Sequence, residues 1–196
     1  MSTIVRMVFS ISMWRKRLDL NEQRERIVKD VERSRERTMN RAFRLLAAKP
    51  RSVTELRERL LEKLWTNEEI VDGIIEKLKE YKYLDDEQFA RDVAVSKLRQ
   101  KPQGKRRLQQ AMSQKKLDRE IVDNAITAAF EKHPEEELLD TAIAKRIRLK
   151  GVPQSREDEK KFYDHLMRLG FGYGLIKEKI ERIKKEGTEP DAQAFD

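Results

Sequence analysis

The feature that most constrains the fold of this chain is an internal repeat with a spacing of 52 residues. Apolar residues and turn residues of the two copies match without a gap. The matched pairs are Ala42 and Ala94, Leu46 and Leu98, Lys49-Pro50 and Lys101-Pro102, Ser52 and Gly104, Leu56 and Leu108, and Leu60 and Met112. After one deletion, Ile70-Val71-Asp72 faces Ile121-Val122-Asp123. A fixed spacing of this length is typical of folds assembled from repeated supersecondary units.

Each copy has the pattern of three helices. In the first copy, apolar residues recur every three or four positions in three separate runs, as expected when each helix buries one stripe. Pro50 ends the first run, and Ser52 with Glu55 predicts a capping box for the second. Thr66 with Glu69 predicts another capping box for the third. The connections are too short for strands to intervene.

A third copy follows, 106 residues after the first. Leu56, Leu60, Ile70 and Ile74 of the first copy match Phe162, Leu166, Ile176 and Ile180. We expect its first helix over Glu135–Lys150, followed by a longer connection through Gly151-Val152-Pro153. Gly170-Phe171-Gly172 stands where the first copy has Trp65-Thr66. Terminal repeats commonly deviate in this way.

The sequence therefore predicts an all-α fold of three tandem three-helix repeats, forming an elongated, curved array preceded by a charged N-terminal helix. The expected ranges are a weakly ordered basic arm (1–18) with a charged lead-in helix up to 37, then repeats at 38–85, 86–134 and 135–187, and a disordered tail at 188–196. We place the start of the folded part near Met39. The alternative is a single irregular helical bundle.

Composition and motifs exclude several classes of protein. Without cysteine there is no disulfide, thiolate zinc site or cysteine nucleophile, which suits a reducing cytoplasm. No segment approaches the roughly 20 apolar residues of a membrane span. Arg6 interrupts the apolar residues 4–14 and the basic cluster follows them, which argues against a secretory signal. Glycine-rich phosphate loops and hydrolase motifs are missing. We therefore predict a cytoplasmic protein that is no enzyme and needs no cofactor.

The clearest local motif runs from Tyr81 to Ala90 and contains Tyr83, Leu84, Asp85, Asp86 and Phe89. We expect Asp85 or Asp86 to cap the next helix, and the three apolar residues to join neighbouring units. A metal site at the paired carboxylates is disfavoured, because no third ligand stands nearby at helical spacing. The two histidines, His133 and His165, are expected to be ordinary surface residues because neither has the neighbours of a catalytic triad.

The positive charge of the chain is concentrated. The net charge is +8, and the segment Val93–Leu117 contains no acidic residue. Its basic residues are Lys97, Arg99, Lys101, Lys105, Arg106, Arg107, Lys115 and Lys116, and a second group comprises Lys145, Arg146, Arg148 and Lys150. Such runs are usually solvated helix faces, but the lack of compensation favours binding of a polyanion.

The predicted contact is with the nucleic-acid backbone. Several of the basic residues flank the Pro102-Gln103-Gly104 turn, where a helix end and a helix start together suit phosphate groups. Few aromatic residues lie among them, and no helix offers an obvious set of side chains for base edges. We therefore expect binding that is independent of sequence.

These motifs together resemble the RecX regulatory proteins of bacteria, over roughly residues 38–186. The resemblance is carried by Arg51-Ser52-x-x-Glu55-Leu56-x-x-x-Leu60, by Tyr83-Leu84-Asp85-Asp86-x-x-Phe89-Ala90, by the Lys-Pro-x-Gly turn before Leu108, and by Leu169-Gly170-Phe171. The match departs from the family pattern at Trp65-Thr66, where a glycine-containing turn is more familiar.

The resemblance implies a regulator without chemistry of its own. RecX proteins consist of three tandem three-helix repeats and modulate the RecA recombinase, usually by inhibition, from the groove of the RecA–DNA filament. The implied partners are the RecA filament and both single- and double-stranded DNA, the implied state is a monomer, and the expected context is DNA repair and the SOS response. Two alternatives remain open: a helix-turn-helix repressor, which predicts base preference, and a helical scaffold that recognises acidic proteins without DNA.

Overall fold

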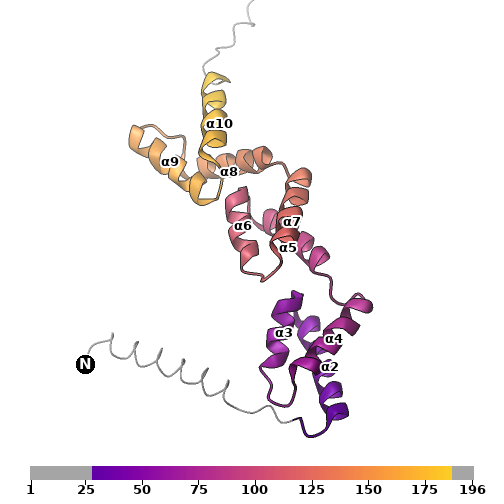
Figure 1. Ribbon diagram of the computed structural model, residues 1–196. Coiled ribbons are helices and arrows are strands. Elements are labelled where there is room, and N and C mark those ends of the chain that lie inside the picture. The colour runs from indigo at the N-terminus through magenta and orange to yellow at the C-terminus, as the bar shows by residue number, and fades with distance from the viewer. Residues whose placement is uncertain (1–27, 187–196) are drawn as a thin grey trace, which may run out of the picture. The chain divides into compact units, whose positions relative to one another are not determined.

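The computed structural model describes residues 28–186, which contain nine α-helices and no strand (Figure 1). The helices are α2 (Val31–Ala48), α3 (Val53–Leu61), α4 (Glu68–Glu80), α5 (Asp86–Gln100), α6 (Lys105–Ser113), α7 (Arg119–Lys132), α8 (Glu135–Lys150), α9 (Arg156–Arg168) and α10 (Tyr173–Glu186). They form three groups of three, which confirms the predicted all-α fold of three-helix repeats. The first helix of the third group has the predicted bounds, Glu135–Lys150.

The chain divides into two compact units, one ending at Leu84 and the other beginning at Asp85. The first unit contains α2, α3 and α4, and the second contains the other six described helices. The predicted basic arm, the start of the predicted lead-in helix and the predicted tail lie outside the described residues. Residues 31–37, most of which are charged, form the first turns of α2.

The core of the first unit is formed by the predicted apolar stripes. Ala42, Leu56 and Leu60 are completely buried and pack with the apolar face of α4, which contributes Ile70, Val71, Ile74, Ile75 and Leu78. Two polar residues of α2, Ser34 and Thr38, are buried as well. α2 therefore begins before Met39, within the charged segment. Its inner face is polar there, because the buried residues are the small side chains of Ser34 and Thr38.

Those two polar residues hold the α3–α4 turn, where the sequence departs from the family pattern. The Ser34 hydroxyl donates to the carbonyl oxygen of Trp65, and the Thr38 and Thr66 hydroxyls lie 3.1 Å apart. The Arg37 guanidinium stacks over the Trp65 ring, 4.4 Å from its centroid. The turn is thus fastened by side chains of α2 instead of by glycine.

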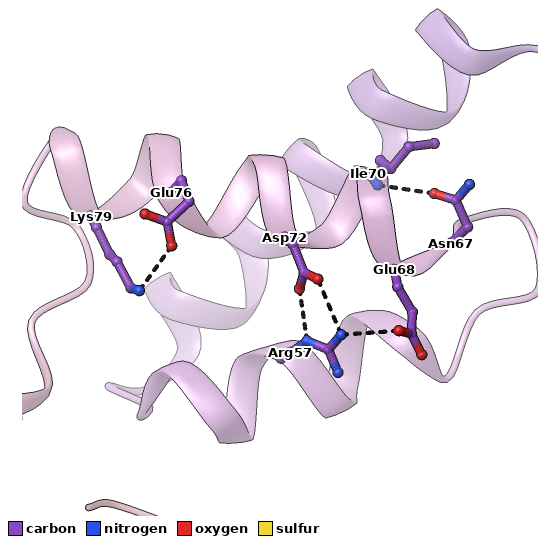
Figure 2. Close-up of polar contacts among 7 residues, drawn as sticks. All are labelled: Arg57, Asn67, Glu68, Ile70, Asp72, Glu76 and Lys79. Atoms are coloured by element: carbon purple, nitrogen blue, oxygen red, sulfur yellow. Dashed lines mark hydrogen bonds and ion pairs between the residues drawn. The ribbon is translucent and has the colours of Figure 1, made fainter.

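The predicted capping box at Thr66 is wrong. The N-cap of α4 is Asn67, whose side-chain oxygen accepts from the Ile70 backbone N–H at 2.9 Å (Figure 2). Thr66 is only 1% exposed and its hydroxyl is used by Thr38. The predicted caps at Ser52, which accepts from the Glu55 N–H, and at Asp85, which accepts from the Gln88 N–H, are confirmed.

A salt bridge on the surface joins α3 to α4. The Arg57 guanidinium contacts both carboxylate oxygens of Asp72, at 2.7 and 3.2 Å, and reaches Glu68 at 3.4 Å (Figure 2). The hydrogen bonds from Arg57 lower the pKa of the Asp72 carboxyl group. The charge of Arg57 is thereby neutralised within the unit.

The second unit has two cores that share a helix. Ala94, Leu108 and Met112, which match Ala42, Leu56 and Leu60, are buried among α5, α6 and α7. Phe162, Leu166 and Ile176 are buried among α8, α9 and α10. Leu138 of α8 packs against both clusters, so α8 connects the second repeat to the third.

We expect Asn67→Ala to lower the free energy of unfolding by about 1 kcal/mol, because an α4 backbone N–H loses its partner. Urea denaturation measures this effect. The matched control is Asn124→Ala, at an exposed position inside α7 that caps no helix, where we expect a change below about 0.5 kcal/mol. Equal effects of the two substitutions would contradict the assignment of the cap.

Candidate polyanion-binding site

The candidate site is built on a direct backbone contact between the second and third repeats. The Gly104 N–H donates to the Leu169 carbonyl oxygen at 2.9 Å. A Cβ atom on Gly104 would lie 2.4 Å from the carbonyl carbon of Gly170, and one on Gly170 would lie 2.5 Å from the Arg107 backbone nitrogen. Gly170 also has a φ of +92°. Both positions therefore require glycine.

Two further hydrogen bonds tie the start of α6 to the third repeat. The Lys105 backbone N–H donates to Oε1 of Glu135 at 2.9 Å, and the Arg107 guanidinium donates to the Arg168 carbonyl oxygen at 3.2 Å. Figure 1 shows the resulting proximity of α6, α8 and the end of α9. We call the contact between residues 101–107 and residues 135 and 168–171 the repeat junction.

A cavity of about 170 Å³ opens at the repeat junction. It is lined by Lys101, Pro102, Ala142, Lys145, Arg146, Leu149, His165 and Leu169. Ala142 and Leu169 are buried, whereas Lys101, Lys145 and Leu149 are exposed. We call this space the junction cavity. It brings together predicted basic residues from α8 and from the end of α5, which lie more than forty positions apart.

His165 was expected to be an ordinary surface residue, but the structure half-buries it in the junction cavity. The pKa of its imidazole is lowered, first because burial removes water from the charged form, and then because Arg146, Arg168 and Lys101 repel a proton. His133 is half-buried at the C-cap of α7.

The cations at the repeat junction are not neutralised by neighbouring carboxylates. Within residues 28–186, the side chains of Lys101, Lys105, Arg106, Lys145 and Arg146 form no ion pair. By contrast, Arg41, Arg57 and Arg59 of the first unit all contact acids. Positive potential therefore accumulates at the junction instead of being cancelled locally.

The first turn of α6 is unusual in its charge. Lys105, Arg106 and Arg107 are exposed there, and the turn has no acidic residue. Cations at a helix N-terminus are unfavourable, because they face the positive end of the helix dipole. The Glu135 carboxylate of the third repeat supplies the missing acid from outside. An approaching anion would therefore meet the exposed cations, whereas the Lys105 N–H is already taken by Glu135.

Other predicted basic residues lie elsewhere in the second unit. Arg99 lines a separate hollow with Arg91 and Asp92, and Lys115 lies over the Phe89 ring, 5.9 Å from its centroid. Lys116 has a φ of +53° in the turn after α6, and Lys97 is half-buried. Arg148 and Lys150 are exposed in the last turn of α8. The junction thus gathers only part of the predicted set.

The motif residues have structural positions. Leu84 is 4% exposed and belongs to the first core, while Tyr83 is exposed with its ring edge-to-face against Phe43. Asp86 is half-buried in the first turn of α5, and Phe89 is 9% exposed. Phe171, next to the close contact at Gly170, is 1% exposed and fills the third core.

Three residues of the site were missed from the sequence. Leu149 and His165 line the junction cavity, and Arg168 lines a larger hollow of about 650 Å³ with Arg146, Lys161, Asp164 and Met167. Two of the three stand on α9, far from the predicted basic runs, and only the packing of the third repeat on the second brings them there. The repeat spacing gave no signal for them, because it aligns equivalent residues and not residues in contact.

This architecture defines a class: a tandem three-helix-repeat protein with a cationic junction between its second and third repeats. Family models agree with the first two repeats, since residues 39–78 match the first three-helix domain of RecX and residues 85–126 match the second. The regulatory protein RecX of Chlorobium limicola is 33% identical over 149 residues, which cover 76% of this chain and 90% of the relative. This chain belongs to the RecX family.

Other relatives and solved structures agree with this assignment. The regulatory protein RecX of Chlorobaculum tepidum is 29% identical, covering 76% of this chain and 89% of the relative. That of Oceanobacillus iheyensis is also 29% identical but is matched over only 54% of its length. The crystal structure of RecX from Lactobacillus salivarius has the same fold, with a TM-score of 0.69 at 20% identity over 78% of this chain and 98% of that one.

The relatives are named as regulatory proteins, not as enzymes. In the described part of the chain, no helix combines the length and apolar character needed to span a membrane.

We expect Gly104→Ala to lower the free energy of unfolding by about 1–3 kcal/mol, because its Cβ would overlap backbone atoms that cannot move away cheaply. Urea denaturation measures the change. Gly73→Ala is the matched control: Gly73 lies inside α4, a Cβ there would have no neighbour within 4 Å, and alanine should stabilise the helix by up to about 1 kcal/mol. Similar stability of both variants would disprove the close contact.

We also expect stability to fall with acid through His165. Its lowered pKa, caused by burial and by Arg146, Arg168 and Lys101, means that the unfolded chain binds the proton more tightly. The loss begins as the pH falls through the ordinary value of 6.5 and is absent well above it. His165→Gln should lose less stability than the wild type between about pH 7 and pH 5.

An NMR titration of the imidazole tests the cause directly. Arg146→Gln should raise the pKa of His165 by removing a repelling charge. Lys132→Gln, at an exposed cation that does not line the junction cavity, should leave it unchanged. A His165 pKa at or above 6.5 in the folded wild type would contradict the described environment.

Proposed function

We propose that this protein is a non-enzymatic regulator that binds the RecA–DNA filament, holds DNA phosphates at the repeat junction and restrains RecA. The supporting observation is that Lys101, Lys145 and Arg146, cations of two repeats, line one cavity and form no ion pair within residues 28–186. Membership of the RecX family supplies RecA as the partner. The proposed cellular setting is the cytoplasm, in DNA repair and the SOS response, with the protein acting as a monomer.

The energetic basis of the proposed contact is counterion release. Each phosphate neutralised by a lysine or arginine frees condensed cations from DNA, which makes affinity strongly dependent on salt. Exposed lysines such as Lys101, Lys105 and Lys145 lose little hydration when they meet exposed phosphates, so the contact forms and dissolves readily. Such binding positions the protein along the backbone without selecting a base sequence.

Restraint of RecA follows from occupying the filament and not from chemistry. A protein that contacts DNA and RecA together stabilises the arrangement in which it is bound and slows changes that require its release. RecA filament growth, strand exchange, ATP hydrolysis and co-protease action all require such changes. We therefore propose inhibition as the main effect, at amounts of the regulator below those of RecA.

The double variant Lys105→Gln/Arg106→Gln should bind DNA more weakly, while keeping its helix content. Its slope of log affinity against log salt should be smaller by about 1.4 for single strands and about 1.8 for duplex DNA, because two phosphate contacts are lost. Arg107 is left intact, since its guanidinium holds the Arg168 carbonyl. Lys77→Gln/Lys82→Gln, at exposed cations of the first unit, is the control with equal charge change.

The decisive assay is ATP hydrolysis by RecA on single-stranded DNA with the regulator present below the RecA concentration. The wild type should lower the rate, the control variant should act like the wild type, and Lys105→Gln/Arg106→Gln should act weakly. Unchanged hydrolysis and strand exchange with the wild type would end the RecA proposal. Affinity that varies strongly with DNA sequence would instead favour the helix-turn-helix repressor.

A further inference from the structure

The junction cavity has an apolar interior beneath its cations. Ala142 and Leu169, only 4% and 7% exposed, form its floor, and half-buried Pro102 adds to it. Leu149 is 64% exposed and forms part of the wall. Phosphate binding alone needs no apolar floor, because a phosphate is strongly hydrated and seeks N–H donors. A ligand that fits the cavity has an apolar part as well as negative charge.

Cations of two repeats line the same cavity as these apolar residues. Lys101 follows the last residue of α5, whereas Lys145 and Arg146 belong to α8. Lys105 and Arg106 continue the positive surface from Lys101 into the first turn of α6. None of the residues that line the cavity is acidic. A linear polymer with one negative charge on each repeating unit suits this arrangement better than one isolated anion.

The aromatic ring in the cavity adds a surface for stacking. His165 is half-buried there, and burial, together with the charges of Arg146, Arg168 and Lys101, lowers the pKa of its ring. A neutral imidazole offers a flat face, on which a planar heterocycle stacks at modest desolvation cost.

We propose that the junction cavity receives one unstacked base of single-stranded DNA, while Lys101, Lys145 and Arg146 hold the phosphates on either side. This inference rests on the proposed DNA contact and adds its preferred form. A nucleotide combines the two required parts, since every base has apolar faces and stands between two phosphates. Bases of a duplex are already stacked and paired, so the cavity favours single strands over duplex DNA.

An acidic peptide with one large apolar side chain has related chemistry. The base is favoured because the cations extend beyond the cavity along α6, as repeated phosphates require, whereas a single peptide anchor needs only the cavity rim. The peptide is therefore the competing outcome of the experiment.

The test compares two fluorescent single strands with the same number of phosphates, an oligothymidylate and an abasic strand, binding to the full chain. The wild type should bind the oligothymidylate about fivefold or more tightly, because only that strand has bases to bury. Leu149→Ala should remove this preference and leave affinity for the abasic strand unchanged, since it alters no charge. Leu149 is exposed, and circular dichroism verifies that the variant stays helical.

Two control variants separate apolar contact from charge. Val152→Ala removes an equally exposed apolar side chain, 60% exposed, that lines a different cavity, and it should keep the full preference. Lys145→Gln should weaken both strands by similar factors, because it removes a phosphate contact and not the apolar wall.

The outcomes are distinguishable. Equal, salt-dependent binding of both strands would overturn the base pocket while leaving the phosphate contact standing. No binding of either strand would overturn both. If a peptide of aspartates around one phenylalanine bound the wild type but not Leu149→Ala, and the strands showed no preference, the cavity would be a protein-docking site and the inference would be wrong.

Discussion

The hydrogen bond from the Gly104 N–H to the Leu169 carbonyl oxygen is the contact on which the candidate site depends. It exists because neither Gly104 nor Gly170 has a side chain, so two backbones approach within reach of each other. With that approach, the end of α5, the start of α6 and the helices of the third repeat meet at one place. The Lys-Pro-x-Gly and Leu-Gly-Phe motifs are therefore two halves of one contact.

Charge is handled differently around α3 of the first unit and at the repeat junction. Around α3, Arg57 is held by Asp72 and Glu68, and Arg41 by Glu62, so these cations are neutralised where they stand. At the repeat junction, cations such as Lys145 and Arg146 have no such partner among residues 28–186. Exposed ion pairs contribute little to stability, so the difference matters mainly for the potential that a partner meets.

The sequence was sufficient for the fold because burial repeats with the spacing. Leu56, Leu108 and Phe162 are equivalent in three copies, and all are buried, since each repeat uses the same inward stripe. Helix ends were less predictable. Thr66 and Asn67 can both cap a helix, and the structure uses Asn67 as the cap while the Thr66 hydroxyl lies buried beside that of Thr38.

The site was predictable only in part. Lys101, Lys145 and Arg146 stood out because their runs lack acids, but His165 and Leu149 have no local signal. Their role arises from packing between repeats, and spacing within a repeat cannot encode it. Packing between repeats also decides which basic residues reach the junction. Arg99 and Lys115 belong to the basic stretch but lie away from the junction.

The Glu135 carboxylate, which accepts from the Lys105 N–H, makes the start of α6 dependent on another repeat. A helix whose own first turn holds only cations relies on a borrowed cap to stay wound. If the third repeat moved away, that turn would lose its cap and fray. Lys105 and Arg106 would then lose their fixed positions, although the net charge would not change. In the proposed DNA contact, affinity therefore depends on whether the third repeat is docked.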